Sequence, residues 1–156
     1  MKKFLTAVIL TAAVLLCGCG ESKTGGDKTA LTAKEVFDIV SAEGLCPSAD
    51  VRAELGSEGF DNACPKLFGI EPSALTDGGI MYVGAGTSAD EIAVLGGNGD
   101  FRTVLEAHAQ SRANDFKGYA PDESDKAKNA LIFTEDGLTI LVIADNAEEI
   151  KDRLTN

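Results

Sequence analysis

The chain has 156 residues, with 14 basic and 25 acidic side chains and a formal net charge of −11 at pH 7. A strongly acidic protein repels the phosphates of nucleic acids and the head groups of anionic lipids. We therefore expect no nucleic-acid partner. The sequence also has no tryptophan and only two tyrosines, which argues against a sugar-binding cleft.

Residues 1–18 have the organisation of a bacterial export signal. Lys2 and Lys3 are basic, and residues 4–16 form an apolar region of about the usual 7–15 residues. A membrane-spanning helix needs about 20 apolar residues, so this region is too short to be one.

The signal ends in Leu16-Cys17-Gly18-Cys19, the pattern of a lipobox: an aliphatic residue, two small ones and the cysteine to be lipidated. Cys17 is the poorer candidate, because Leu16 would then directly precede the cleavage point. An ordinary secretory signal is the alternative. Lipidation of Cys19, with palmitate as an expected acyl chain, predicts a protein anchored by lipid at the extracytoplasmic face of the cell membrane.

Cleavage before Cys19 removes Lys2 and Lys3 but no acidic side chain, so the mature chain is more acidic than its precursor. Residues 19–30 comprise the lipidated cysteine and a polar, glycine-bearing segment, and their composition predicts a flexible tether of roughly 18 Å. We expect residues 31–156 to form a single domain with its own core.

The first element after the tether is a helix with a complete start pattern. Thr32 is placed as its N-cap and Glu35 three residues later completes a capping box, while Leu31 and Val36 can form a hydrophobic staple. Gly44 ends it. The pattern then weakens, and we expect two short helices at 48–55 and 61–68.

Two cysteines remain in this part of the chain. Cys46 and Cys64 are an even pair in an exported protein, which predicts a disulfide closing a loop of about 18 residues. Two buried free thiols are the alternative. A redox role is not expected, because the chain has no Cys-x-x-Cys here and no neighbouring histidine.

The rest of the chain repeats one plan twice. Apolar runs at 80–83 and 92–95 predict a hairpin, followed by a helix from Asp100 to Lys117. Runs at 130–134 and 138–144 predict a second hairpin, followed by a helix capped by Asp145. The predicted fold is α+β: a four-stranded antiparallel sheet from two hairpin-helix units, with the N-terminal helices packed against it.

The predicted helix 100–117 carries the main candidate site. His108, the only histidine, and Arg112 lie on one stripe with the apolar residues of that helix. One interpretation makes them the polar floor of a pocket. The other makes them a buried polar pair, with Arg112 bound to a carboxylate such as Glu91. His108 lacks an evident nucleophile, and catalytic residues cannot be assigned.

Other patterns give no cofactor or metal site. Residues 84–89 fit the dinucleotide fingerprint G-x-G-x-x-A, but the fingerprint needs a helix immediately afterwards, and the next residues favour a strand. Residues 122–125 are acidic without the spacing of a calcium loop, which favours a solvated loop. We expect neither cofactor nor metal.

Several motifs resemble those of the bacterial lipoproteins called the domain of unknown function 4358 family. The motifs are Leu67 to Pro72, Ser88 to Ala93, Arg112 with Phe116 and residues 119–121, Asn129-Ala130, and Gly137. The resemblance covers roughly residues 32–156. It implies a membrane-anchored extracytoplasmic domain without an assigned activity.

Two function classes follow. The first is a non-catalytic binding or assembly module that contacts an envelope protein or ligand. The second is an envelope hydrolase or transferase that uses His108 and Arg112. A buried His108 favours the first class, and an open cleft lined by Glu91, His108 and Arg112 favours the second.

If Cys19 carries the lipid, Cys19→Ala should leave uncleaved precursor or release the protein into the medium, because the signal peptidase and the lipid both need this cysteine. Intact-mass analysis of the membrane fraction checks this. An unmodified mature protein that starts at another residue would contradict it.

Overall fold

The computed structural model describes residues 30–156, which form an α+β fold with a five-stranded antiparallel sheet. In chain order the elements are α1 (Ala33–Ala42), β1 (Val51–Glu54), α2 (Glu58–Phe68), the 3₁₀ helix η1 (Pro72–Ala74), β2 (Asp77–Tyr82), β3 (Glu91–Gly96), α3 (Phe101–Phe116), α4 (Pro121–Lys128), β4 (Leu131–Glu135), β5 (Leu138–Ile143) and α5 (Ala147–Thr155). The strand order is β1-β2-β3-β5-β4.

The predicted α+β class and both hairpins are confirmed, but the predicted number of four strands is wrong. The fifth strand is β1, which lies in the segment expected to be a short helix at 48–55. It pairs antiparallel with β2, from Val51 opposite Tyr82 to Glu54 opposite Gly79. Because this segment is so short, its sequence has too little periodicity to identify a strand. Pairing with β2 decides that it adopts the extended conformation.

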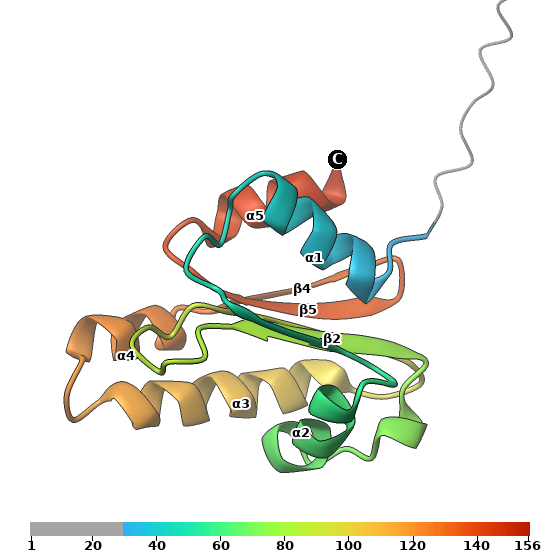
Figure 1. Ribbon diagram of the computed structural model, residues 1–156, viewed down its shortest axis with the longest axis horizontal. Helices are drawn as coiled ribbons and strands as arrows, with labels where there is room; N and C mark the ends of the chain where they lie inside the picture. The colour runs from blue at the N-terminus through green and yellow to red at the C-terminus, as the bar shows by residue number, and fades with distance from the viewer. Residues whose placement is uncertain (1–29) are drawn as a thin grey trace, which may run out of the picture.

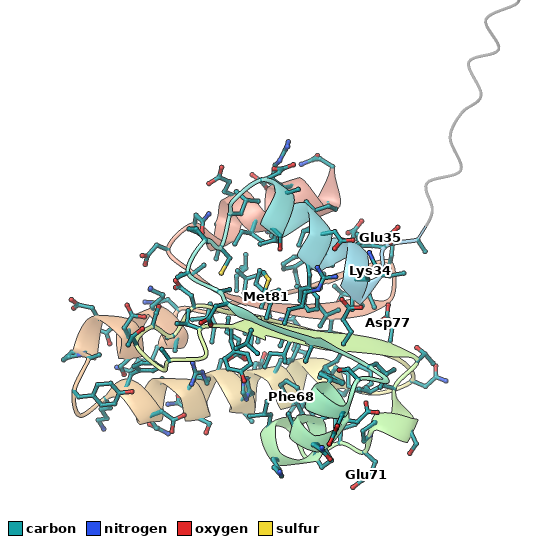
Figure 2. All side chains as sticks on the ribbon, viewed as in Figure 1. Lys34, Glu35, Phe68, Glu71, Asp77 and Met81 are labelled. Atoms are coloured by element: carbon teal, nitrogen blue, oxygen red, sulfur yellow. The ribbon has the colours of Figure 1, made fainter. Side chains whose placement is uncertain are left out.

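The helices cover both faces of the sheet (Figure 1). Helices α1 and α5 lie on one face, and α2, α3 and α4 lie on the other. Side chains of successive strand residues alternate between the two cores: Ile140 and Val142 face α1 and α5, whereas Leu141 and Ile143 face α3. Figure 2 shows the same separation, with Met81 on the α1 side and Phe68 on the α2 side. The helices of the two hairpin-helix units therefore lie on opposite faces.

Local signals set the ends of two predicted helices. The Thr32 hydroxyl accepts a hydrogen bond from the Glu35 amide at 3.2 Å, and the Thr32 amide donates to the Glu35 carboxylate at 2.9 Å, so the capping box is confirmed. Asp100 caps α3 as predicted. On β2, a Cβ at Gly79 would lie 2.5 Å from the ring of Phe37. Only glycine at this position lets α1 approach the sheet this closely.

Two local predictions are wrong. The acidic residues expected in a solvated loop at 122–125 belong to α4, which begins with Pro121 and has Lys126 and Lys128 in its last turn. Proline at the first helical position and cations at the end both favour a helix. The last helix is preceded by Asn146 as its N-cap residue, not by Asp145.

The disulfide predicted between Cys46 and Cys64 is not formed in this structure. Both thiols are free and buried, and they belong to the two cores on opposite sides of the sheet. Burial, together with the nearby charges of Asp61 and Glu71, raises the pKa of Cys64 to about 11. Burial and the charge of Asp90 also raise the pKa of Cys46. Both are therefore protonated at neutral pH and poor nucleophiles.

The predicted signal peptide, lipidation at Cys19 and all of the tether except residue 30 lie outside the described residues. Within residues 30–156, no helix has the length and apolar character needed to cross a membrane.

Because Ile140 is fully buried in β5, between β3 and β4, its truncation removes contacts that the rigid sheet cannot replace. Ile140→Ala should lower the free energy of unfolding by about 2–5 kcal/mol, and Ile140→Val by about 0.5–1.5 kcal/mol. Urea denaturation measures both. A loss below about 0.5 kcal/mol for Ile140→Ala would show that β5 is not the centre of the core.

Candidate functional site

A cavity of about 360 Å³ opens between α2 and α3 on the face of the sheet opposite α1. One side of α2 forms its wall, at the helical spacing Gly59, Ala63, Lys66 and Leu67. The opposite side of α2 carries Phe60, Cys64 and Phe68 into the core. The amphipathic pattern of this helix therefore both anchors it and shapes the cavity.

The strands supply the floor of the cavity. Glu91 is the first residue of β3 and lies opposite Tyr82, the last residue of β2. Because side chains alternate along a strand, Glu91 points to the same face as the buried Ala93 and Leu95, which pack towards α3. The sheet thus places a carboxylate at the edge of an apolar core.

The three polar residues predicted as a pocket or a buried polar pair lie together in this cavity. His108 Nε2 on α3 lies 2.5 Å from Glu91 Oε1, and Arg112 Nε one turn later lies 3.0 Å from Glu91 Oε2. The side chains of Glu91 and His108 are only 3% exposed, and that of Arg112 is 18% exposed. We call these three residues the Glu91 cluster. Its members come from the start of β3 and from two successive turns of α3, so the fold brings together residues that are distant in the sequence.

The electrostatics of a buried carboxylate explain why the three side chains of the Glu91 cluster lie together. Transferring a carboxylate from water into a protein interior costs several kcal/mol unless partners replace its hydration. An ionised carboxylate only accepts hydrogen bonds, so His108 Nε2 donates to it. Arg112 contributes its positive charge at 3.0 Å but without hydrogen-bond geometry at Nε. Glu91 therefore holds both side chains of α3 against the sheet.

Aromatic rings fix the two α3 side chains from the sides. The ring of Phe68, at the end of α2, meets the His108 imidazole edge-on at 4.9 Å between centroids. The guanidinium of Arg112 lies 5.1 Å from the centroid of the Phe116 ring. Such contacts restrict the rotamers of His108 and Arg112. The cluster is therefore packed against aromatic rings while still lining the cavity.

The side chains that line the cavity limit the chemistry that it can perform. A carboxylate that orients an imidazole is one half of a general-base arrangement. However, the residues that line the cavity include no serine, threonine or cysteine. Among residues 30–156, no group of three or more histidine, cysteine, aspartate or glutamate side chains is arranged to hold a metal ion.

A second polar cluster holds the loop that leads into β3. Lys126 Nζ on α4 lies 2.8 Å from Asp90 Oδ1 and 3.2 Å from Glu123 Oε1. The Glu123 carboxylate also accepts hydrogen bonds from the Ala89 amide and the Ser88 hydroxyl. These contacts fix the chain directly before Glu91, so α4 positions the start of β3.

The pKa values of this second cluster reflect its ion pairs. Burial alone would lower the pKa of Lys126, but hydrogen bonds to Asp90 and Glu123 outweigh it and raise that pKa. Burial would raise the pKa of Asp90, but hydrogen bonds from Lys126 and Ser48 outweigh it and lower that pKa. Lys126 and Asp90 are therefore both charged at neutral pH.

The dinucleotide-like segment 84–89 lies in the loop between β2 and β3. A strand, β3, follows it instead of the helix that the fingerprint needs. The structure gives this segment no context for a dinucleotide.

All three members of the Glu91 cluster were predicted from the sequence, but the wall of the cavity on α2 was missed. The spacing of Ala63, Lys66 and Leu67 was a signal that could have been used, since it marks a side of the helix distinct from the buried one. Lys126 was missed because the acidic segment around it was interpreted as a loop.

No protein-family model matches this chain, and no curated protein or solved structure matches it either. The resemblance to the domain of unknown function 4358 family stays a prediction.

Glu91→Gln should lower the free energy of unfolding by about 3 kcal/mol, because it leaves the Arg112 charge without its buried counter-ion. Urea denaturation compares this variant with Glu106→Gln, a matched change at an exposed position on α3. The control should change stability by less than about 0.5 kcal/mol. Equal effects of the two substitutions would show that the Glu91 cluster does not stabilise the fold.

Proposed function

We propose that this protein is a lipid-anchored, non-catalytic binding module of the cell envelope, and that its ligand or partner enters the cavity between α2 and α3. Cys19 and the tether would hold the domain at the extracytoplasmic face of the membrane, as the resemblance to the lipoprotein family also implies. This confinement raises the effective concentration of the domain for other envelope molecules.

The observation that carries the proposal is the Glu91 cluster at the floor of a largely apolar cavity. Ligand sites are typically concave and apolar, with a few fixed polar groups that set orientation. The cavity has this composition, with Leu67 and Tyr82 in its walls and Arg112 among its polar groups. His108 is buried, and its Nε2 is hydrogen-bonded to Glu91, which favours binding over catalysis.

The attachment point of the tether supports the same proposal. The Leu31 amide donates a hydrogen bond of 2.8 Å to Asp136 Oδ2 in the turn between β4 and β5. The described chain therefore starts beside α1 (Figure 1), while the cavity lies on the α2 and α3 face of the sheet. An anchored domain would keep the cavity accessible on the side away from the attachment point.

The hydrolase or transferase alternative is favoured by a specific observation as well. Glu91, His108 and Arg112 do line one cavity, and Glu91 orients the imidazole. The described residues offer no hydrogen-bond partner to His108 Nδ1. In a catalytic site, this nitrogen would be free to accept a proton from a substrate.

Photo-cross-linking on intact cells tests the proposal. A benzophenone amino acid at Leu67, which is 38% exposed at the cavity, should give a discrete cross-linked product, because a bound molecule would touch this wall. The same probe at Thr134, exposed on β4 away from the cavity, is the control and should give none. Mass spectrometry of the purified protein identifies the products.

Two further variants separate the alternatives. The part of Cys19→Ala that is released into the medium should give less of the Leu67 product, because the released domain is diluted. His108→Gln keeps a donor towards Glu91 and should leave the yield unchanged in a binding module. A yield that rises in His108→Gln would instead indicate a substrate that the variant no longer turns over. The binding proposal fails if Leu67 gives no product or if Thr134 gives the same one.

A further inference from the structure

Arg112 differs from the other arginines of residues 30–156, because its guanidinium has no hydrogen bond whereas those of Arg52, Arg102 and Arg153 do. Its Nε is buried and lies 3.0 Å from Glu91 Oε2 without hydrogen-bond geometry, and its Nη1 lies 3.9 Å from Asp115. None of residues 30–156 accepts a hydrogen bond from it, although the side chain is only 18% exposed. The Nε–H is buried against Glu91, so the four N–H donors of the two Nη atoms are the ones left for a ligand in the cavity that Arg112 lines.

The charge around the cavity is opposite in sign to that of the whole domain. The cavity is lined by two cations, Lys66 and Arg112, and by one carboxylate, Glu91. With His108 counted as neutral, as it is in the net charge of −11 for the whole chain, these charged side chains sum to +1. A single negative charge on a ligand would balance it, whereas a doubly charged phosphate would exceed it beside the carboxylate of Glu91.

Apart from Asn62 and the Tyr82 hydroxyl, the remaining surface of the cavity is apolar. Ala63 and Leu67 on α2 face Ile80 and Tyr82 on β2. A volume of about 360 Å³ lies at the low end of the usual range for ligand sites. The space suits one small aliphatic group.

From these three observations we propose that the cavity binds a carboxylate carried on a small aliphatic group, with the carboxylate on the guanidinium of Arg112 and the aliphatic group against Leu67. The inference rests on the proposed binding function and names its ligand class. The planar guanidinium matches a carboxylate with two parallel hydrogen bonds. Two sources share this chemistry: a short fatty acid, and the carboxyl terminus of a peptide that ends in an aliphatic residue.

Calorimetric titration of the purified domain at pH 7 tests the ligand class with defined probes. Octanoate represents the fatty acid and N-acetyl-leucine the peptide end, and octanamide and N-acetyl-leucinamide are their uncharged counterparts. At least one carboxylate should bind about tenfold more tightly than its amide, because only the carboxylate forms charge-assisted hydrogen bonds with the guanidinium. The tighter carboxylate identifies the source. Octyl phosphate should bind more weakly than octanoate.

Variants locate the site. Arg112→Gln should weaken carboxylate binding about tenfold, whereas Lys117→Gln, the same loss of charge at an exposed position directly after α3, should leave it within about twofold. If Arg112→Gln does not fold, Leu67→Glu tests the same point, because it places a negative charge at an already exposed wall of the cavity. Leu67→Glu should abolish carboxylate binding while circular dichroism shows an intact fold.

The proposal is overturned if neither carboxylate binds to the folded domain, if an amide binds as tightly as its acid, or if Leu67→Glu leaves binding unchanged. Its failure is distinguishable from failure of the binding function. A cross-linked product at Leu67 without carboxylate binding would overturn the ligand class alone, whereas the absence of any product at Leu67 would overturn the function.

Discussion

The buried carboxylate of Glu91 is the constraint on which the α2 and α3 face of this protein depends. A charge at 3% exposure is tolerated only when partners replace its hydration. His108 and Arg112 meet this need from one side of α3, and this fixes how the helix lies on the sheet. The cavity exists because α2 then packs against α3 through Phe68 and leaves a gap beside the cluster.

The two faces of the sheet differ in composition, and this difference explains how the fold accommodates a buried polar cluster. On the α1 and α5 face, residues such as Ile140 and Phe37 form an apolar core. The other face combines an apolar core with the Glu91 cluster at its edge. Lys126 on α4 holds the loop before β3 through Asp90, so the strand that carries Glu91 is fixed where it begins. The Glu91 cluster and the cavity thus both lie on the α2 and α3 face of the sheet.

Sequence patterns predicted what local physics controls. The capping box at Thr32, the Asp100 cap and the apolar strand β5 are each encoded within a few residues, and they are correct. Strand β1 was missed because it becomes a strand only by pairing with β2, which follows it in the chain beyond α2 and η1.

Two other outcomes depend on tertiary packing. The disulfide failed because the sheet separates Cys46 from Cys64, and this topology is invisible in their spacing. The Glu91 cluster was found because helical spacing put His108 and Arg112 on one stripe. The cavity beside it depends on how α2 packs, which no local pattern encodes.

We expect Glu91, His108 and Arg112 to act as one unit. Double-mutant cycles measure this directly, with Gln substituted at each position and the free energy of unfolding determined for single and double variants. Groups that share a buried network show coupling energies of about 0.5–3 kcal/mol, and we expect coupling in this range for both the Glu91–His108 and the Glu91–Arg112 pair. Effects that add to within about 0.3 kcal/mol would contradict this, since the three residues would then stabilise the fold independently.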